Sequence, residues 1–164
     1  MNSVIVDGDG ARVSLLAAWL AIAAVATALV LLASLHVLSP EFDPAWRMVS
    51  EYANGRYGWV LSLMFAAWGV STLALAAAIR AAARATRFKV GVALLATAGV
   101  GEVLASVFDL NHDTLHSLAG ALGIPCLPLA ALLISGSLGR TPAWAAARRL
   151  LRWTAHLTWV SVAL

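Results

Sequence analysis

The sequence has little charge. Only 12% of its 164 residues are Asp, Glu, Lys or Arg, whereas soluble globular proteins carry about 25%. Hydrophobic residues make up 62% of the chain. A chain of this composition cannot cover a water-facing surface, and its apolar content is far too high for a disordered protein. The composition therefore favours an integral membrane protein.

Cysteine and the common enzyme motifs are also scarce. Cys126 is the single cysteine, which excludes a disulfide framework and a zinc site built from cysteine ligands. The sequence has no G-x-S-x-G, no P-loop, no H-E-x-x-H and no dinucleotide-binding glycine motif. The net charge of +3 does not indicate nucleic-acid binding, because the arginines lie in short gaps between apolar runs.

Long apolar runs are what the sequence has in abundance. A helix needs about 20 mostly apolar residues to cross a bilayer. Runs of this kind lie at residues 13–38, 58–79, 90–108 and 115–138, and a shorter one lies at 150–164. We predict a single all-α membrane domain over residues 1–164, a polytopic transmembrane helical bundle with four full spans and a partial fifth. Because 15 residues of helix rise only about 22 Å, we expect the chain to end before its fifth helix does.

Basic and acidic residues separate along the chain. The connections that follow the second and fourth runs hold no acid and these bases: Arg80, Arg84, Arg87, Lys89, Arg140, Arg148, Arg149 and Arg152. Five of the eight acidic residues lie in the other two connections, at 39–57 and 109–114. Because basic loops stay in the cytoplasm, we expect a multi-pass protein of the plasma (inner) membrane with a cytoplasmic N-terminus at 1–12.

The first acidic connection carries helix signals. Asp43 suits an N-cap, Pro44 suits the first helical position and Asn54-Gly55 suits a stop, which predicts a helix of about three turns on the membrane surface. Asp43, Arg47 and Glu51 follow each other at intervals of four residues and would form one charged stripe. The stripe fits a surface helix with self-paired charges, or a lid over a site at the extracytoplasmic face.

Glu102 lies well inside the third apolar run. A carboxyl group at that depth costs a few kcal/mol, so its side chain should face protein or water. One interpretation is a neutral glutamate that is hydrogen-bonded to a neighbouring helix. The other is a proton carrier, a ligand or a general acid/base.

A cluster of acids and histidines follows the third run. Asp109, His112, Asp113 and His116 are spaced at i, i+3, i+4 and i+7, and on one continuous helix they would share a face with Glu102. Imidazoles and carboxylates are ligands for Zn²⁺ or a similar divalent metal, and Asp109, His112 and His116 are the candidate metal ligands. Glu102 or Asp113 would then be the catalytic base that activates water.

The same cluster has a structural interpretation. The chain has to turn between the third and fourth runs, near Leu110-Asn111, so a shared face is not guaranteed. Asp113 would then be the N-cap of the fourth helix, and His116 would form a hydrogen bond with Asp109 across the turn. His36, near the end of the first run, lies on the same side, and with His116 it could hold a haem axially.

Several stretches resemble one known family. They are Leu35-His36-Val37-Leu38-Ser39-Pro40-Glu41-Phe42-Asp43-Pro44, Val49-Ser50-Glu51-Tyr52 and Phe108-Asp109 followed by His116 and Gly120. They resemble the small multi-pass prokaryotic membrane family known as domain of unknown function 998. The resemblance covers essentially the whole chain, and Asp43, Ser50, Glu51, Asp109 and His116 match its motif positions. It implies a six-helix membrane protein, of which this chain would lack the last helix, and it implies no particular activity. The acid–histidine arrangement also resembles, by analogy alone, membrane hydrolases of the alkaline ceramidase type.

These observations support three functional hypotheses. The favoured hypothesis is an accessory or scaffold protein, or a lipid- or ion-handling protein, of the membrane with an acid–histidine cluster at the extracytoplasmic face. The second is a metal-dependent hydrolase of a lipid or lipid-linked substrate, and the third is a haem-binding electron carrier. The expected partners are the lipid bilayer and, beyond it, a lipid substrate, a membrane protein or a second copy of the chain.

Overall fold

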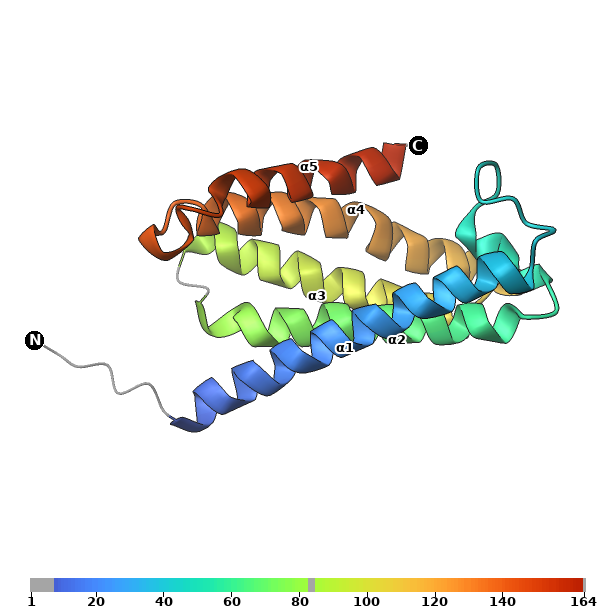
Figure 1. Cartoon of the computed structure of the whole chain (residues 1–164), viewed down its shortest axis with the longest axis horizontal. Helices are drawn as coiled ribbons and strands as arrows, with labels where there is room; N and C mark the ends of the chain where they lie inside the picture. Colours follow the sequence, from blue (N-terminus) through green and yellow to red (C-terminus); the bar gives the residue numbers. More distant parts are fainter. Residues whose placement is uncertain (1–7, 83–84, 164) are drawn as a thin grey trace, which may run out of the picture.

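The computed structural model describes residues 8–82 and 85–163, which form helices joined by short connections, with no strand among them (Figure 1). The long helices are α1 (Gly8–Leu38), α2 (Gly58–Ile79), α3 (Thr86–Val107), α4 (Asp113–Leu138) and α5 (Arg148–Ala163). Short 3₁₀ helices lie between them: η1 (Val49–Asn54), η2 (Arg80–Ala82), η3 (Leu110–His112) and η4 (Pro142–Trp144). Most of the predicted N-terminal tail (1–7), Arg84 and Leu164 lie outside the described residues.

The all-α fold class is confirmed. Four of the described helices are long and apolar enough to cross a membrane, so the chain is a multi-pass membrane protein. The bounds of α2 are those predicted from its apolar run, whereas α1, α3 and α4 each begin a few residues earlier than their runs. The early starts add polar residues such as Thr86 and Asp113, because a helix continues into the headgroup region after its apolar stretch has ended.

The helices pack in chain order, each against its neighbour in sequence. Close contacts join α1 to α2, α2 to α3, α3 to α4 and α4 to α5, and the last of these is the least extensive (Figure 1). α2 and α3 bury larger shares of their surfaces than α1, which has one neighbouring helix, and than α4, whose contact with α5 is less extensive. The interior of the protein is therefore the region around α2 and α3.

Small residues allow the helices to approach one another. Ala21, Ala24 and Ala28 are buried on the side of α1 that faces α2. There the Ser71 hydroxyl of α2 donates a hydrogen bond of 2.8 Å to the carbonyl oxygen of Ala21. Small side chains and hydroxyl-to-carbonyl bonds are the usual means of packing helices in a membrane, where the hydrophobic effect gives no drive to association.

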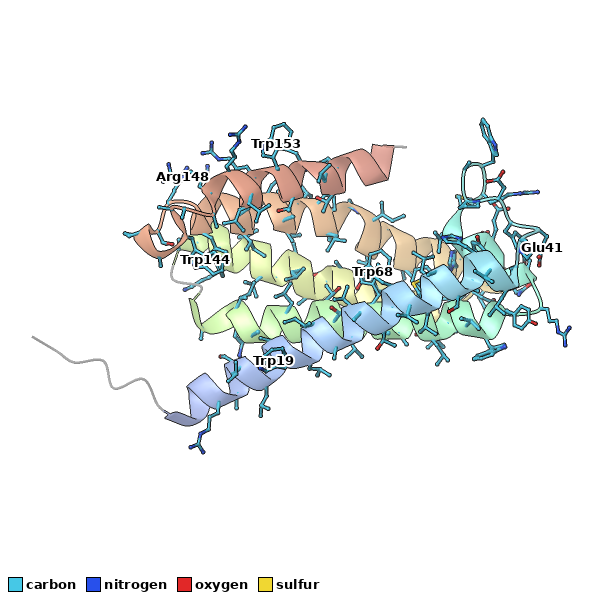
Figure 2. The ribbon with its side chains drawn as sticks, viewed as in Figure 1. Trp19, Glu41, Trp68, Trp144, Arg148 and Trp153 are labelled. Carbon is cyan, nitrogen blue, oxygen red and sulfur yellow. The ribbon has the colours of Figure 1, made fainter. Side chains whose placement is uncertain are left out.

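The two ends of the bundle differ in charge. We call the end that carries residues 39–57 and 108–112 the acidic end, and the end that carries residues 80–82, 85 and 139–147 the basic end. Figure 2 shows Glu41 at the first of these ends and Arg148 with Trp144 at the second. The separation of charges that the sequence shows therefore persists in three dimensions.

Only the second half of the predicted surface helix at the acidic end forms a helix, η1, which ends at Asn54 before Gly55 as predicted. Asp43 does begin a turn, in which its carbonyl oxygen accepts from Trp46 N and Arg47 N. The helix stops there because Met48 is extended (φ −67°, ψ 144°), and the chain resumes as η1. Tyr52 within η1 is buried against α1 and α2. The burial of this aromatic ring outweighs the local helix signals of Asp43 and Pro44.

Candidate functional site

Glu102 is buried where α3 packs between α2 and α4. Only 8% of its surface is exposed, and its Oε2 atom has no hydrogen-bond partner among the described residues. The side chain of Thr72 on α2, itself buried, interacts with the Glu102 carboxyl group. A buried polar atom without a partner is rare in native proteins and calls for an explanation, such as an ion, a water or a proton.

Close helix packing fixes the Glu102 side chain in place. On one side, a Cβ atom added at Gly69 of α2 would lie 2.6 Å from Val103 Cγ2. On the other side, a Cβ atom added at Gly101 of α3 would lie 2.6 Å from Gly123 N and 2.7 Å from the Ala119 carbonyl oxygen of α4. Because the backbones touch at this level, the carboxyl group is held between helices rather than exposed to lipid.

The helix does not continue from Glu102 to His116. Phe108 and Asp109 are both extended, with φ −107° and −78° and ψ 96° and −175°. The sequence predicts a turn near Leu110-Asn111. In the structure the chain turns one or two residues earlier, at Phe108 and Asp109. The prediction that Glu102, Asp109, His112, Asp113 and His116 share the face of one helix is wrong, because that face requires a continuous helix.

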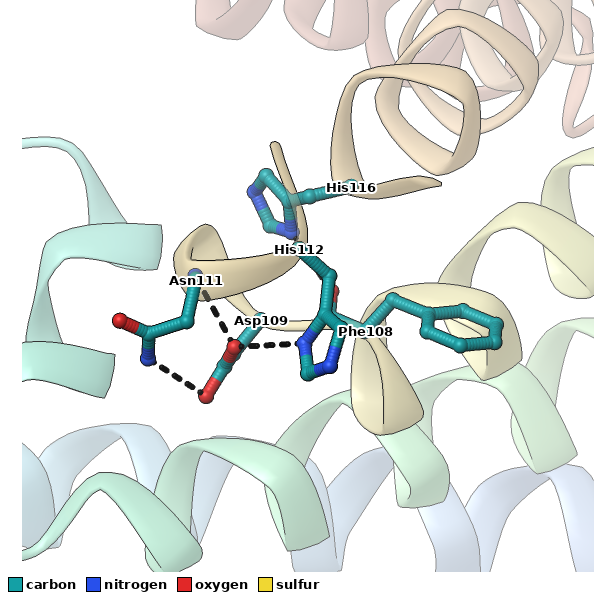
Figure 3. A network of polar contacts seen from close by, with 5 residues as sticks. All are labelled: Phe108, Asp109, Asn111, His112 and His116. Atoms are coloured by element: carbon teal, nitrogen blue, oxygen red, sulfur yellow. Dashed lines mark hydrogen bonds and ion pairs between the residues drawn. The ribbon is translucent and has the colours of Figure 1, made fainter. Parts of the chain in front are cut away.

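Asp109 organises this turn (Figure 3). Its Oδ1 atom accepts from Asn111 N at 3.0 Å and from His112 Nδ1 at 3.1 Å, and its Oδ2 atom accepts from Asn111 Nδ2 at 3.1 Å. The bonds from the Asn111 and His112 side chains hold the pKa of Asp109 below its usual value. All of these partners lie within three residues, so the carboxylate acts as a cap for η3.

His116 bonds to the chain across the turn, but not to Asp109. Its Nδ1 atom lies 2.9 Å from the Phe108 carbonyl oxygen. A carbonyl oxygen can only accept, so Nδ1 carries a proton, and in the neutral form of the ring the free lone pair is then on Nε2. The same reasoning applies to His112, whose Nδ1 donates to a carboxylate. Both rings are therefore oriented so that Nε2 is available for a proton or a ligand.

The three predicted metal ligands, Asp109, His112 and His116, are not gathered into one group in the described part of the chain. Within the described parts of the chain, no group of three or more His, Cys, Asp or Glu side chains is arranged to hold a metal ion. Asp113 is the first residue of α4 rather than its N-cap, which is His112. Metal binding by Asp109, His112 and His116 stays a prediction, and both carboxylate oxygens of Asp109 are already engaged.

His36 belongs to a second network at the acidic end. Its Nδ1 atom lies 2.7 Å from the Tyr52 hydroxyl, and that hydroxyl donates to the Phe42 carbonyl oxygen at 3.0 Å. The Tyr52 hydroxyl has one proton, which it donates to the Phe42 carbonyl oxygen. His36 Nδ1 must therefore be the donor in its bond with the Tyr52 hydroxyl. Burial raises the pKa of Tyr52, and the neighbouring charges of Asp43 and Glu41 raise it further.

The charged stripe of the first connection is paired only in part. Arg47 and Glu51 form an ion pair at 2.9 Å, and Glu51 Oε1 also accepts from Met48 N at 3.1 Å. Asp43 accepts from Ala45 N at 2.9 Å instead of joining the stripe. Since Arg47 is exposed, this arrangement fits local structure more closely than a lid that carries charges to a ligand.

Comparison of the sequence with known protein families shows which family the chain belongs to. The sequence pattern of the family described as "Protein of unknown function (DUF998)" matches residues 12–164. The chain belongs to this DUF998 family. No curated protein and no solved structure matches the chain. Membership of DUF998 confirms the resemblance that the motifs around His36, Glu51 and His116 suggest, and it adds no activity.

Two contributors to the site were not foreseen from the sequence. Thr72 carries no signal, because threonines are common in membrane helices and its partner is thirty residues away. Tyr52 is 1% exposed and bonds to His36. Tyr52 and His36 are sixteen residues apart, and this spacing does not predict a contact, because the contact depends on how the connection between α1 and α2 folds.

Proposed function

We propose that this DUF998 protein is a non-enzymatic, ion-handling membrane protein in which Glu102 takes up and releases a proton inside the helix bundle. The observation that supports this proposal is the buried carboxyl group with an unpartnered oxygen. Ionisable groups at such depth are costly, and in membrane proteins they commonly mark ion pathways and proton relays.

A purely structural role explains Glu102 less well. A structural glutamate would be expected to satisfy both of its oxygens, since a half-satisfied polar group destabilises a buried interface. Here Thr72 interacts with the carboxyl group and Oε2 has no partner among the described residues. The free oxygen is the position at which a proton, a water or a cation would be held.

We propose His116 as the group that exchanges protons between Glu102 and the acidic end. The contact of Gly101 with Ala119 and Gly123 sets the relative height of α3 and α4. From this register His116 lies about one helical turn, roughly 5 Å, nearer to the acidic end than Glu102. Its Nε2 lone pair, left free by the bond from Nδ1 to Phe108, is a suitable acceptor for a proton.

We further propose that the acidic end faces the outside of the plasma membrane. The support is the clustering of Arg and Lys at the opposite end, which cytoplasmic loops favour. The test uses a Cys126→Ser background with a single cysteine at position 87 or at position 113. A membrane-impermeant thiol reagent added to intact cells should label position 113 and not position 87, and the reverse pattern would overturn the orientation.

The hydrolase and haem hypotheses have less support. A metal-dependent hydrolase needs a ligand set, and the described residues supply no such group. The haem hypothesis rests on His36 and His116 alone, and the Nδ1 partners of these two rings, Tyr52 and Phe108, lie on different connections of the acidic end. We therefore develop neither of them as the function.

The proposal is tested by proton flux in liposomes. The purified full chain is reconstituted with a trapped pH-sensitive dye, and an inward proton gradient is imposed at zero membrane potential. We expect internal acidification to be faster than in empty liposomes, and Glu102→Gln to return it to the empty-liposome rate. Glu41→Gln is the matched control, because it removes an exposed carboxylate and should leave the rate unchanged.

A second pair of variants tests the route. His116→Gln should slow acidification, whereas His112→Gln should not, since its ring is exposed beside Asp109. If the wild-type protein is folded, by circular dichroism, and acidifies liposomes no faster than the empty vesicles do, the proposed function is wrong. Equal rates for wild type and Glu102→Gln would reject Glu102 as the proton-carrying group.

A further inference from the structure

A pocket lined by arginines lies at the basic end, on α5. It has a volume of about 600 Å³, and its lining includes Arg148, Arg149, Arg152, Trp153 and His156. This volume is within the ~300–1,000 Å³ range of small-molecule sites. Figure 2 shows Arg148 and Trp153 on α5, at the opposite end of the molecule from Glu41.

The sequence of α5 explains why these side chains gather. Arg149, Arg152, Trp153 and His156 are spaced at i, i+3, i+4 and i+7, so they share one face of the helix. Ala155, on the side of α5 that packs against α4, is 2% exposed, whereas these four residues are exposed. The arginine face is thus turned away from the bundle and towards the surroundings of the protein.

Arg148 and the other two arginines have different parts in this pocket. The Nε atom of Arg148 donates to the Gly139 carbonyl oxygen at 2.6 Å, which fixes its side chain at the end of α4. Such a bond satisfies a carbonyl group that the helix end leaves open. Arg149 and Arg152 are exposed, and neither has an ion pair among the described residues. They remain available to a ligand.

Among the acidic residues whose side chains the structure describes, none neutralises the pocket. The acidic residues whose side chains the structure describes lie at the acidic end or within α3: Glu41, Asp43, Glu51, Glu102, Asp109 and Asp113. Three guanidinium groups around one cavity repel each other unless an anion lies between them. Guanidinium groups are also the preferred partners of phosphate, because their planar array of donors matches its oxygens.

We propose that the α5 pocket binds a phosphate-bearing group, and that this group is the headgroup of an anionic phospholipid. Arg149 and Arg152 contact the phosphate, Arg148 adds a fixed positive charge, and Trp153 packs against the glycerol and upper acyl region. The pocket lies at the end of a membrane-spanning bundle, where lipid phosphates are concentrated, and tryptophan is enriched at this depth.

The test is a titration of the full chain in detergent, followed by native mass spectrometry. The probes are phosphatidylglycerol, zwitterionic phosphatidylcholine and water-soluble glycerol phosphate. We expect phosphatidylglycerol to bind in preference to phosphatidylcholine. The double variant Arg149→Gln/Arg152→Gln should weaken its binding roughly tenfold or more, since each arginine near an anionic headgroup is worth about a fivefold change in affinity.

The matched control is Arg87→Gln/Lys89→Gln. It removes the same number of charges from the start of α3, at the basic end but outside the pocket. The control should change the affinity for phosphatidylglycerol less than twofold. If both double variants weaken binding equally, the attraction is a general effect of positive charge and the proposed site is wrong.

Two further measurements keep the outcome clear. Glycerol phosphate that binds as tightly as the lipid, and is lost in the pocket variant, would support the phosphate site and reject the lipid as its source. Circular dichroism during heating shows whether the variant is folded. If it is not, Arg149→Lys/Arg152→Lys replaces it, and this variant should bind more weakly than wild type because lysine lacks the planar donor array.

Discussion

Glu102 and Asp109 are seven residues apart, and their surroundings are opposite. Glu102 is buried between helices, has one partner on α2 and leaves Oε2 without a hydrogen bond among the described residues. Asp109 is partly exposed, and both of its oxygens accept bonds from residues two and three positions away. The carboxylate with many partners shapes a turn, and the one with few is the candidate for function.

This contrast gives a physical criterion for the other polar groups. The bonds of Arg47 with Glu51 and of His112 with Asp109 are local and lie at the surface, where such pairs contribute little to stability. The arginines on the outer face of α5 resemble Glu102 instead, because the described structure provides them with no opposite charge. We therefore expect proton transfer or ligand binding at the groups for which the described structure provides no hydrogen-bond partner or opposite charge.

The largest expected effect comes from the packing that buries Glu102. In Gly101→Ala the new Cβ would collide with backbone atoms of Gly123 and Ala119, which cannot move aside cheaply. We expect a loss of about 2–3 kcal/mol in unfolding free energy, typical of an overpacked interface. Denaturant titration in detergent measures it.

Gly136→Ala on α4 is the control for that substitution. Nothing lies within 4 Å of the Cβ position there. Alanine should leave stability unchanged or raise it by up to about 1 kcal/mol, because it favours the helix. Equal losses in the two variants would show that α3 and α4 do not approach each other at Gly101.

The second effect concerns the His36–Tyr52 network. Tyr52→Phe leaves the Phe42 carbonyl group and the His36 Nδ1–H without their partner, and we expect a loss of about 1–2 kcal/mol in unfolding free energy. Tyr57→Phe, whose hydroxyl makes no bond within the described structure, should cost almost nothing. Similar stabilities for both variants would contradict the network.

The Tyr52 network also has an expected pH dependence. The folded protein raises the pKa of this phenol above its ordinary value of 10.0, so the unfolded chain ionises first as pH rises. The contribution of Tyr52 to stability is therefore complete below pH 10.0 and is lost as pH increases through the folded-state pKa. The difference in stability between wild type and Tyr52→Phe should shrink over that range.

A smaller effect is expected at the turn. Asp109→Ala removes the cap of η3 and should reduce unfolding free energy by about 0.5–1 kcal/mol, since the site is partly exposed. The bonds that lower the pKa of Asp109 contribute above pH 3.8 and are lost as pH falls through the folded-state pKa. A variant with no loss at neutral pH, or with abolished metal binding, would favour the metal interpretation over the cap.

The smallest effect on stability is expected at Glu102 itself. Glu102→Met removes a carboxyl group whose Oε2 has no partner, and the Thr72 hydroxyl that loses its partner can bond to a carbonyl oxygen of its own helix instead, so the change is close to neutral. We expect unfolding free energy within about 1 kcal/mol of wild type, measured as for Gly101→Ala. A loss of several kcal/mol would indicate a structural glutamate and weaken the contrast with Asp109.

The fold was largely predictable from the sequence because lipid imposes a simple rule. Every span needs about 20 apolar residues with internally bonded backbone, so runs such as 58–79 gave the helix bounds directly. The connection at 39–57 was not predictable in the same way. Its local helix signals at Asp43 and Pro44 compete with the burial of Tyr52, and that burial depends on α1 and α2 being already packed.

The candidate site was predictable only at Glu102, since its depth follows from counting residues within an apolar run. Periodicity grouped Asp109 and His116 with it, but the extended backbone at Phe108 and Asp109 separates them. Partners such as Thr72 depend on how α2 and α3 are rotated against each other, which spacing along one helix does not reveal. The sequence shows that Arg149, Arg152 and Trp153 have helical spacing, but only the structure shows that they line one pocket.

The most direct test of the central claim is infrared difference spectroscopy of the protein in lipid, titrated between acidic and alkaline pH in H₂O and D₂O. A carboxyl C=O band that grows on acidification, shifts in D₂O, is missing in Glu102→Gln and persists in Glu41→Gln would show that Glu102 exchanges its proton inside the bundle. Spectra of wild type and Glu102→Gln that titrate identically would contradict the account.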